Sequence, residues 1–480
     1  MDFKIKYLLD GYIVILVLTM LWQTFKPLPK NINYKSKKYI IGENDIKFFN
    51  DLTVGDNVEQ QIFDRILNLI DKARKYILID IFLFNSFNVQ TDKIHSKIYE
   101  KISYKLINKI KKYPNIKIDI VTDSINLVYY GGENKELEKL KNAGVNVIIT
   151  DLKKLRDSNP LYSSIWRSLF QWFGNSNKLG FFPHPFSSRA EKVSLRTYLY
   201  LLNFKANHRK VIVADRGDQM VSIITSANIH NASSTHSNVA VEIIGEFWKN
   251  IYISENAVAR LSGKKLSNQV LPGIKNGENS ENVVEVFLIT ERKIREQLVG
   301  LIQCAQKNEL IRIGVFYLSS RIIIKELIKA SKRGVNIKII LDPNKDAFGY
   351  RKNGIPNRQV ARELINKTNG NIKIRWYNTT GEQFHSKFII LNKCNKKVMC
   401  LLGSANFTRR NLENYNLETD VMVVGKNEID FFQSIDRYFE KIWYNKNNKK
   451  YTLNYDIYKD KSLIKQFVYR IQEFFGISGF

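Results

Sequence analysis

The sequence predicts an α/β protein made of two similar halves, each with a mixed, mostly parallel sheet flanked by helices. Three observations lead to this prediction. Strand and helix patterns alternate along the chain, the order strand, helix, strand, helix, strand occurs twice, and each copy ends in the same histidine-lysine motif. With 480 residues the chain can hold two such halves. We expect them at 41–262 and 283–450, with a polar linker at 263–282.

The first half begins with three apolar runs that have the length and β-branched content of buried strands. These runs lie at 76–84, 115–123 and 145–150. A lysine-rich helical pattern that ends at residue 112 and a second helical pattern at 133–142 separate them. The alternation predicts strands joined by helical crossovers.

The second half repeats this order. Strand patterns occur at 310–318, 336–342 and 372–377. Helical patterns at 322–331 and 358–366 lie between them. The repetition predicts a duplicated fold rather than one large irregular domain.

Each half then carries a His-x-Lys motif at the start of an apolar strand, followed by a turn with Ser and Asn and later by Glu. Side chains two residues apart on a strand share a face, so the His and Lys of each motif point the same way. His to Ser is 18 residues in one copy and 19 in the other, and His to Glu is 34 and 33. The first copy comprises His208, Lys210, Asp215, Ser226, Asn228 and Glu242, and the second His385, Lys387, Asn392, Ser404, Asn406 and Glu418.

These motifs resemble those of the phospholipase D superfamily, whose mark is His-x-Lys-x4-Asp followed by Gly/Ser-Ser-x-x-Asn. The phrase at 204–210 is most similar to the bacterial cardiolipin synthase and phospholipase D branch, and the resemblance covers residues 60–445. It implies two halves related by a pseudo-twofold axis, with the active site between them. Asn392 departs from the usual Asp of the family. That Asp is chiefly a structural partner there, so we expect Asn392→Asp to keep turnover. As members of the motifs, Asp215 and Asn392 are still grouped with the predicted catalytic residues His208, Lys210, His385 and Lys387.

The side chains of the two motifs suit a phosphodiester substrate. Lysine, serine and asparagine groups can hold the non-bridging oxygens and stabilise the charge of the transition state. The resemblance implies that His208 is the nucleophile, forming a phosphohistidine, and that His385 is the acid and base; the reverse assignment stays open. We expect Glu242 and Glu418 to accept the second imidazole N–H and fix the tautomer. The chain has no clustered carboxylates or Cys/His ligand set, so we expect no metal and no other cofactor.

Further polar residues lie near the predicted site. Asp123 and Asp342 fall at equivalent strand ends, where each could cap a turn or bind substrate. His230 and His236 follow Asn228 closely. They are interpreted as loop residues that could line the pocket.

The net charge restricts the partners. The chain has 75 basic and 46 acidic side chains, a formal charge of +29. Such a field attracts polyanions, either nucleic acid or an anionic membrane surface. Three cysteines, an odd number without metal-like spacing, make a disulfide framework improbable.

Residues 1–40 are expected to form a membrane anchor and a juxtamembrane linker. The stretch 7–25 is almost wholly apolar, about the length that spans a bilayer. Residues 22–25 offer no small-residue cleavage site, which favours an uncleaved anchor over a signal peptide. We expect the inner membrane of a bacterium. More lysines follow the stretch than precede it, which favours a cytoplasmic catalytic part without fixing the side.

Two further segments are apolar in pattern. An insertion at 151–202 is dense in aromatics beside Arg167, Lys178 and Arg189, which suits a membrane interface, a pocket for acyl chains or ordinary core. The C-terminal segment 451–480 is amphipathic. Its apolar stripe is expected to dock on the body of the protein.

Together these features predict a membrane-anchored enzyme of the phospholipase D and cardiolipin synthase type. It would transfer a phosphatidyl group from a phospholipid to an alcohol or to water through a phosphohistidine. The alternative is a phosphodiesterase that acts on nucleic acid, attracted by the charge. A catalytically lapsed binding protein is a third possibility. No feature of the sequence indicates an oligomeric state.

Overall fold

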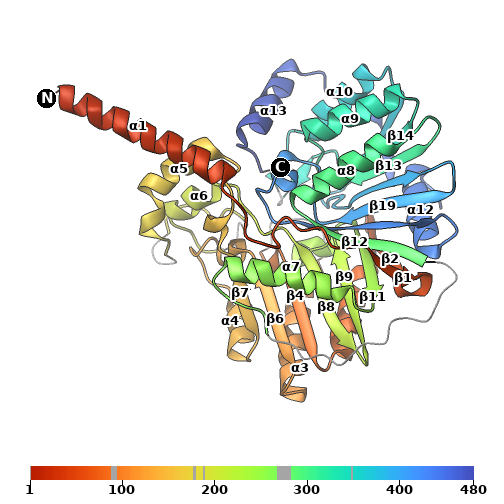
Figure 1. Cartoon of the computed structure of the whole chain (residues 1–480), viewed down its shortest axis with the longest axis horizontal. Helices are drawn as coiled ribbons and strands as arrows, with labels where there is room; N and C mark the ends of the chain where they lie inside the picture. The colour runs from red at the N-terminus through yellow and green to blue at the C-terminus, as the bar shows by residue number, and fades with distance from the viewer. Residues whose placement is uncertain are drawn as a thin grey trace.

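The computed structural model describes residues 2–87, 95–176, 180–187, 190–267, 283–347 and 350–479. Two α/β halves lie against each other, each built on one large sheet flanked by helices (Figure 1). This confirms the predicted fold class. Most of the predicted linker, residues 268–282, lies outside the described residues.

The first sheet has eight strands. In spatial order they are β3 (Asn57–Gln60), β2 (Ile46–Val54), β11 (Asn238–Ile244), β9 (Gln219–Thr225), β8 (Lys210–Arg216), β4 (Tyr76–Ile81), β6 (Lys117–Thr122) and β7 (Asn146–Ile149). The second sheet has nine strands. They are β1 (Tyr39–Gly42), β12 (Val283–Thr290), β20 (Thr419–Lys426), β19 (Lys397–Gly403), β18 (Lys387–Asn392), β13 (Leu310–Val315), β14 (Asn336–Leu341), β17 (Ile372–Tyr377) and β21 (Thr452–Asn454). Two small two-stranded sheets pair β5 (Phe84–Asn85) with β10 (Ile229–His230) and β15 (Asp346–Ala347) with β16 (Tyr350–Arg351).

The sheets are mixed, as expected, but the prediction that they are mostly parallel is wrong. Within the two large sheets, the parallel pairs are β4–β6–β7 in the first and β13–β14–β17 in the second, where helices connect the strands. The motif strands return through short turns, as at Gly217, between β8 and β9. Such turns join antiparallel strands, which accounts for the pairs β8–β9 and β18–β19. On its other side each motif strand is also antiparallel to its neighbour, β8 to β4 and β18 to β13.

The chain order also differs from a simple division into two halves. Strand β1 precedes the first sheet in the chain but pairs with β12 at the edge of the second sheet. Strand β21 closes the other edge by pairing with β17, so the second half extends past the predicted end at 450.

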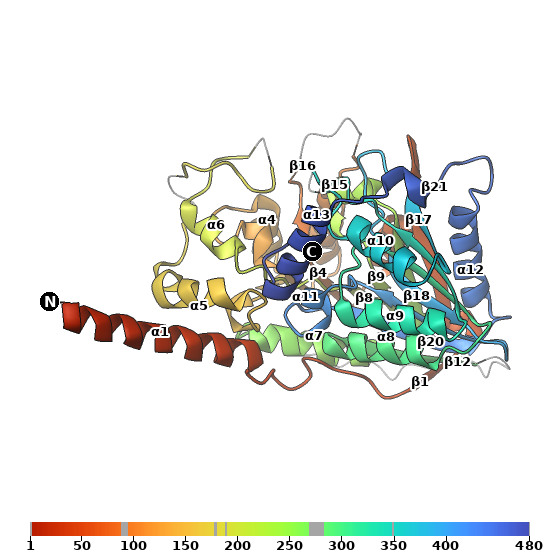
Figure 2. The ribbon, with the colours of Figure 1, turned by 90° about the horizontal axis from the view of Figure 1, so that it is seen from above.

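Helices cover the outer faces of both sheets and pack near their junction (Figures 1 and 2). The first sheet carries α2 (Ile62–Lys72), α3 (Ile98–Lys112) and α4 (Lys135–Asn142); the second carries α8 (Arg292–Cys304), α9 (Arg321–Lys332) and α10 (Asn357–Lys367). The other helices are α1 (Asp2–Phe25), α5 (Pro160–Leu169), α6 (Leu195–Leu201), α7 (Trp248–Leu261), α11 (Arg409–Leu412), α12 (Asp430–Trp443) and α13 (Leu463–Phe475). Single 3-10 turns are η1 (Glu43–Asp45), η2 (Ser124–Leu127), η3 (Leu152–Lys154), η4 (Gln171–Phe173), η5 (Asn231–Thr235) and η6 (Tyr455–Tyr458).

The motif strands are buried on both faces, which explains their continuous apolar sequence. In β8, Val211 and Val213 join the core shared by the two halves, while Ile212 and Ala214 join the core under the outer helices of the first half. Alternate side chains of a strand point to opposite faces, so a run of β-branched residues fills both layers. Strand β18 does the same with Phe388 and Ile390 on the shared side.

An apolar helix projects from the body at the N-terminus (Figure 2). The segment Lys4–Phe25 of α1 has a mean hydropathy of 1.7, is 22 residues long and is not buried by the rest of the chain. It is long and apolar enough to cross a membrane. The insertion packs along it: the Tyr12 and Ser168 hydroxyls are 2.9 Å apart, and Asp157 N donates to Gln23 O.

The insertion is only partly core. Trp166 and Tyr200 are buried, whereas Trp172 and Phe173 are 75% and 65% exposed. The part of the insertion with Trp166 and Tyr200 is therefore ordinary core, whereas the part with Trp172 and Phe173 exposes aromatic rings. Lys178 and Arg189 lie outside the described residues.

The C-terminal helix does not dock through its apolar stripe, so that prediction is wrong. Leu463, Phe467 and Phe474 are exposed, and α13 contacts the body through Tyr469 and Glu473. The Tyr469 hydroxyl donates to Ser319 O, and the Ser319 hydroxyl donates to Glu473. The buried face of α13 thus combines the Tyr469 ring, which joins the apolar core of the second half, with these polar contacts.

A buried ion-pair cluster connects the two halves. Arg209 is fully buried and binds Glu255 of α7 at 3.0 Å and Glu291, just before α8, at 2.6 Å. Its own strand comes from the first half, while Glu291 belongs to the second. Guanidinium burial is tolerated here because two carboxylates surround it.

We predict that Arg209→Met lowers the free energy of unfolding by about 3–5 kcal/mol, because it leaves two buried carboxylates unpaired. Urea denaturation of the purified chain measures this change. Arg437→Met is the matched control, since Arg437 is 62% exposed and pairs with exposed Asp430. Equal stability of both variants would contradict the prediction.

Candidate active site

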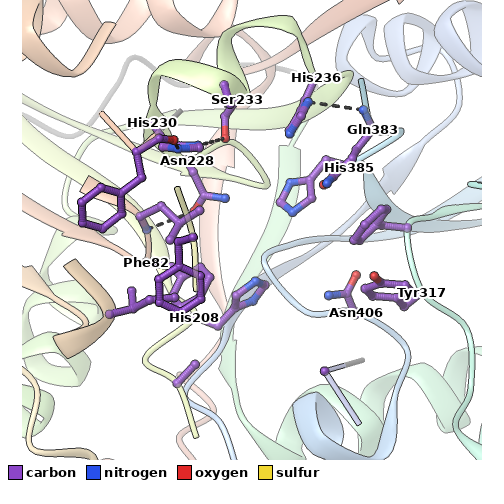
Figure 3. A pocket seen from close by; sticks show the side chains of 18 of the residues that line it. Phe82, His208, Asn228, His230, Ser233, His236, Tyr317, Gln383, His385 and Asn406 are labelled. Carbon is purple, nitrogen blue, oxygen red and sulfur yellow. Dashed lines mark hydrogen bonds between the residues drawn. The ribbon is translucent and has the colours of Figure 1, made fainter. Parts of the chain in front are cut away.

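A cavity lies where the two halves meet (Figure 3). It has a volume of about 150 Å³, and its wall includes both motif histidines, His208 and His385. Asn228 and Asn406 also line it, one from each half. The structure thus brings together, in one cavity, residues that are separated by more than 170 positions in the chain.

Each histidine is held by the turn of the opposite half. His208 N donates to Leu417 O at 2.8 Å, and Ser237 N donates to Gln383 O at 3.0 Å, two residues before His385. Single parallel bridges join Asn207 to Leu417 and Ser237 to Phe384. These two backbone contacts between the halves are related by the pseudo-twofold relation. Each half thus depends on the other to position its histidine.

Glu418 of the second half orients His208 of the first. The Nδ1 of His208 lies 2.9 Å from one carboxylate oxygen and 3.0 Å from the other. Ser404 and Asn411 also donate to this carboxylate. Burial lowers the pKa of His208 to about 4, although Glu418 acts to raise it. The neutral ring then keeps its proton on Nδ1 and leaves Nε2 with a lone pair.

His385 has a neutral orienting group instead. Its Nδ1 lies 2.9 Å from Ser226 O and 3.3 Å from Asn238 Oδ1. A carbonyl oxygen only accepts, so Nδ1 carries the proton and Nε2 is the free base in the neutral ring. Burial, with Lys387 and Lys210 nearby, holds the pKa of His385 well below its ordinary value.

The expected role of Glu242 is wrong, and Asn238 occupies the place assigned to it. Glu242 forms a salt bridge with Arg65 and lies 3.8 Å from Arg216. It does not contact either motif histidine. Sheet register explains the error: Ser226 N bonds to Val239 O just as Ser404 N bonds to Thr419 O. The position equivalent to Glu418 is therefore Asn238. The loop before β11 is shorter than its counterpart before β20, so equal spacing from His selected a residue further along the strand.

The two lysines lie beneath the site rather than in its wall. Lys210 Nζ donates to His208 O at 2.7 Å, and Lys387 Nζ donates to His385 O at 2.6 Å. Both are fully buried, and burial lowers the pKa of Lys210 to about 7 and that of Lys387 well below its ordinary value. Their side chains therefore hold the backbone of the two histidines in place.

The two serines do not face the cavity, which contradicts their prediction as phosphate ligands. The Ser226 hydroxyl bonds to Asn238 Oδ1 at 3.1 Å, and the Ser404 hydroxyl bonds to Glu418. They hold the groups that orient the imidazoles. The asparagines do reach the cavity. Leu83 N donates to Asn228 Oδ1 at 3.4 Å, which leaves the amide nitrogen of Asn228 available to a ligand.

Asp215 and Asn392 lie at the far ends of their strands and do not line the cavity, so their grouping with the catalytic residues is wrong. Asp215 accepts three backbone N–H groups from residues 74–76, at 2.8–2.9 Å. Asn392 instead accepts from Arg312 and donates to Asp436. Asp215 and Asn392 therefore stabilise the ends of β8 and β18, respectively, through different hydrogen bonds.

Asp123 and Asp342 are turn caps, which decides between the two roles considered for them. Asp123 accepts from Asn207 N at 2.6 Å, and Asp342 accepts from Phe384 N at 2.9 Å. Each carboxylate thus anchors the residue directly before a motif histidine. Burial raises the pKa of both to about 7.

His230 and His236 line the cavity, one of the two alternatives considered for them. His236 packs beside His385 with ring centroids 6.0 Å apart, and Gln383 N donates to its Nδ1. His230 Nε2 donates to Phe87 O at 2.6 Å. In Figure 3 these rings form the wall on the His385 and Asn228 side of the cavity.

Aromatic rings and one arginine complete the wall, and sequence reasoning did not identify them. Phe82 and Phe316 occupy equivalent positions after β4 and β13; each packs against a motif histidine and covers a motif lysine. Tyr317 and Arg410 also line the cavity. The shared position of the two phenylalanines after matching strands was a detectable signal. Nothing in the sequence distinguished Arg410.

Among the residues that the structure describes, no group of three or more His, Cys, Asp or Glu side chains is arranged to hold a metal ion. The polar residues of the cavity wall carry imidazoles, amides, hydroxyls and a guanidinium. Such groups bind oxyanions directly.

The comparisons with known proteins agree with this geometry. Residues 298–443 match the family model described as cardiolipin synthase, phospholipase D-like domain. The crystal structure of phosphatidylserine synthase from Haemophilus influenzae Rd KW20 superposes with a TM-score of 0.59 at 11% identity, covering 91% of this chain and 94% of that one. No curated protein matches the chain in sequence.

Two further solved structures match this chain with TM-scores below 0.5. Polyphosphate kinase from Porphyromonas gingivalis has a TM-score of 0.46 at 12% identity, covering 90% of this chain and 53% of that one. Nuc from Salmonella typhimurium, a phospholipase D family member, has a TM-score of 0.27 at 21% identity, covering 36% of this chain and 97% of that one.

The match over residues 298–443, together with the fold of the whole chain, indicates a phospholipase D-type enzyme. The second half is similar to the phospholipase D-like domain of cardiolipin synthases.

We predict that Glu418→Gln lowers the pKa of His208 below about 4, because the variant removes the one carboxylate that favours the charged ring. Nuclear magnetic resonance titration of the imidazole signals measures this change. His385 provides the internal control, since Asn238 and a carbonyl contact its Nδ1. An unchanged or higher pKa of His208 would show that Glu418 does not act on this ring.

Proposed function

We propose that the protein transfers a phosphatidyl group from a phospholipid to an alcohol or to water through a phosphohistidine intermediate, while anchored in a cell membrane by α1. The observation that carries this proposal is the pair of imidazoles, His208 and His385, in one cavity between the halves. Each ring has its Nδ1 occupied by an acceptor, so both Nε2 atoms are available to the substrate.

In the first step, Nε2 of His208 attacks the phosphorus and the bond to the head-group oxygen breaks. The Glu418 carboxylate favours this role for His208, because the phosphorylated ring is cationic and keeps its N–H directed at that carboxylate. His385, protonated on Nε2, gives its proton to the departing alkoxide. The anionic substrate raises the proton affinity of His385 on entering the cavity, which offsets the effect of burial.

In the second step, Nε2 of His385 takes the proton of the incoming hydroxyl. The new oxygen attacks phosphorus, and the bond to His208 breaks. Asn228 and Asn406 supply amide donors for the non-bridging oxygens. The same residues serve hydrolysis and transfer, which differ only in whether water or an alcohol attacks.

A lipid substrate is favoured by the surroundings of the cavity. One wall is apolar, with Phe82, Phe87, Ile125 and Phe186. Phe186 belongs to the insertion, whose helices α5 and α6 lie near α1 (Figure 2) and which carries exposed aromatic rings at Trp172 and Phe173. Aromatic side chains of this kind suit the boundary between water and lipid.

Nucleic acid is the second candidate substrate, supported by the net charge of +29. The two candidates are separated by offering the purified full-length protein phospholipid vesicles and single-stranded DNA, both in EDTA. Release of head group or formation of a new phospholipid supports the first. Cutting of DNA alone would overturn it.

We predict that His208→Ala and His385→Ala each lower turnover of a phospholipid by at least about 10³-fold, because each removes one of the two reacting nitrogens. With a phospholipid that is labelled in the phosphate and carries a nitrophenol head group, which leaves without needing a proton, a denaturing quench at alkaline pH should leave label on His385→Ala and none on His208→Ala. The quench is alkaline because the phosphorus–nitrogen bond of a phosphohistidine is lost in acid. Asn392→Asp is the control and keeps turnover, since its side chain lies outside the cavity. Label on the His208→Ala protein would reverse the assigned roles.

We predict that removal of residues 1–30 moves the protein from the membrane fraction to the soluble fraction, since α1 supplies the apolar span. Sedimentation of cell membranes measures this. The matched variant carries the same deletion with Trp172→Ser and Phe173→Ser. If the deletion alone stays with membranes and the combined variant does not, the insertion is the principal membrane contact.

A further inference from the structure

Arg410 is a cavity residue with no role in the chemistry described above. Arg410 lies on α11, which follows the Ser404–Asn406 turn in the sequence, and it lines the same cavity as the two motif histidines. Its Nε and Nη2 atoms are shielded from solvent, and neither has a hydrogen-bond partner in the part of the chain that the structure describes.

The surroundings of Arg410 do not neutralise its charge. Its guanidinium carbon lies 5.1 Å from the ring centre of Phe204, and no carboxylate among the described residues lies within salt-bridge distance. Glu473 is nearby, but its carboxylate accepts from Ser319. Burial lowers the pKa of Arg410 to about 10. The group therefore remains charged near neutral pH.

Two buried arginines of this protein have their partners within the fold, unlike the shielded Nε and Nη2 atoms of half-buried Arg410. Arg209 binds two carboxylates, and Arg167 binds Asp157 through two nitrogens. A buried cation without such partners is costly, and buried polar groups are rarely left unpaired. Since Arg410 is unpaired within the fold and lines a cavity, a ligand is the natural source of its missing acceptors.

The pseudo-twofold relation makes this residue distinctive. Arg410 follows Asn406 by four positions, and Ala232 follows Asn228 by four positions. Both residues line the cavity. One wall therefore carries an additional cation that the duplicated wall lacks. The two motifs, one from each half, already suit the phosphodiester between them. The additional cation of one half therefore suits a charged group that the substrate carries on only one side of that phosphodiester.

We propose that Arg410 binds a second anionic group, a phosphate or a carboxylate, carried by the head group of the donor or by the acceptor, beside the phosphodiester held at the histidines. This inference rests on the proposed function. The planar guanidinium offers two parallel N–H donors to an oxyanion, the arrangement that carboxylates and phosphates bind best. The enzyme would then select substrates with that additional negative charge over neutral analogues.

Turnover with matched substrate pairs tests this. The acceptor pair is glycerol 3-phosphate and glycerol, which differ by one phosphate; the donor pair is phosphatidylserine and phosphatidylethanolamine, which differ by one carboxylate. Arg410→Gln should reduce the preference for the charged member of one pair by roughly 10- to 100-fold, the worth of a charged hydrogen bond. The pair that responds identifies the bearer of the charge. Arg410→Lys should restore part of the preference.

Arg437→Gln is the control, because Arg437 is exposed on α12 and distant from the cavity wall. Its preferences should equal those of the native protein. Unchanged preferences of Arg410→Gln in both pairs would overturn the proposal. A comparison of melting temperatures shows whether Arg410→Gln remains folded, and Arg410→Lys, which keeps the charge, tests the site if it does not.

Calorimetry separates this proposal from the proposed function. Glycerol 3-phosphate and glycerate are titrated into the full-length native protein and into Arg410→Gln. At least one of the two compounds should bind Arg410→Gln at least about tenfold more weakly than it binds the native protein. A native protein that turns over no phospholipid but shows this loss would contradict the proposed function and support the anion site. Equal affinities for both probes would overturn the anion site alone.

Discussion

The structure depends on the exchange of contacts between its two halves at the motif histidines. Glu418 from the second half orients His208 of the first, and the turn after β9 orients His385 of the second. Backbone bridges accompany both contacts, and buried Arg209 binds carboxylates of both halves close by. Because each half supplies what the other half's histidine needs, docking of the halves and assembly of the cavity are the same event.

This exchange also explains how a duplicated sequence produces unequal sites. The position that holds the Glu418 carboxylate opposite His208 holds the Asn238 amide opposite His385, where the Ser226 carbonyl oxygen is a further acceptor. A carboxylate favours a cationic ring, whereas neutral acceptors fix the tautomer without favouring the charge. The asymmetry agrees with different tasks for the two imidazoles, and Arg410 against Ala232 adds a second difference in the same cavity wall.

The N-terminal half carries additional elements toward one side of the molecule. The insertion packs along α1 through α5 (Figures 1 and 2), contributes Phe186 to the cavity and carries exposed aromatic rings at Trp172 and Phe173. An apolar helix, exposed aromatic side chains and a partly apolar cavity are thus connected through one segment of chain. This arrangement supports the lipid substrate of the proposed function over nucleic acid.

The sequence by itself determined the duplication, the strands, and the identity of His208, His385, Asn228 and Asn406, because these follow from local periodicity and from motifs that recur at near-equal spacing. It misassigned Glu242, since spacing along a chain does not report sheet register. The pairing of Ser226 with Val239, visible only in the folded sheet, identifies Asn238 instead. The antiparallel majority, the buried face of α13 and the unpaired guanidinium of Arg410 were likewise decided by tertiary packing, because each depends on which distant surfaces come into contact.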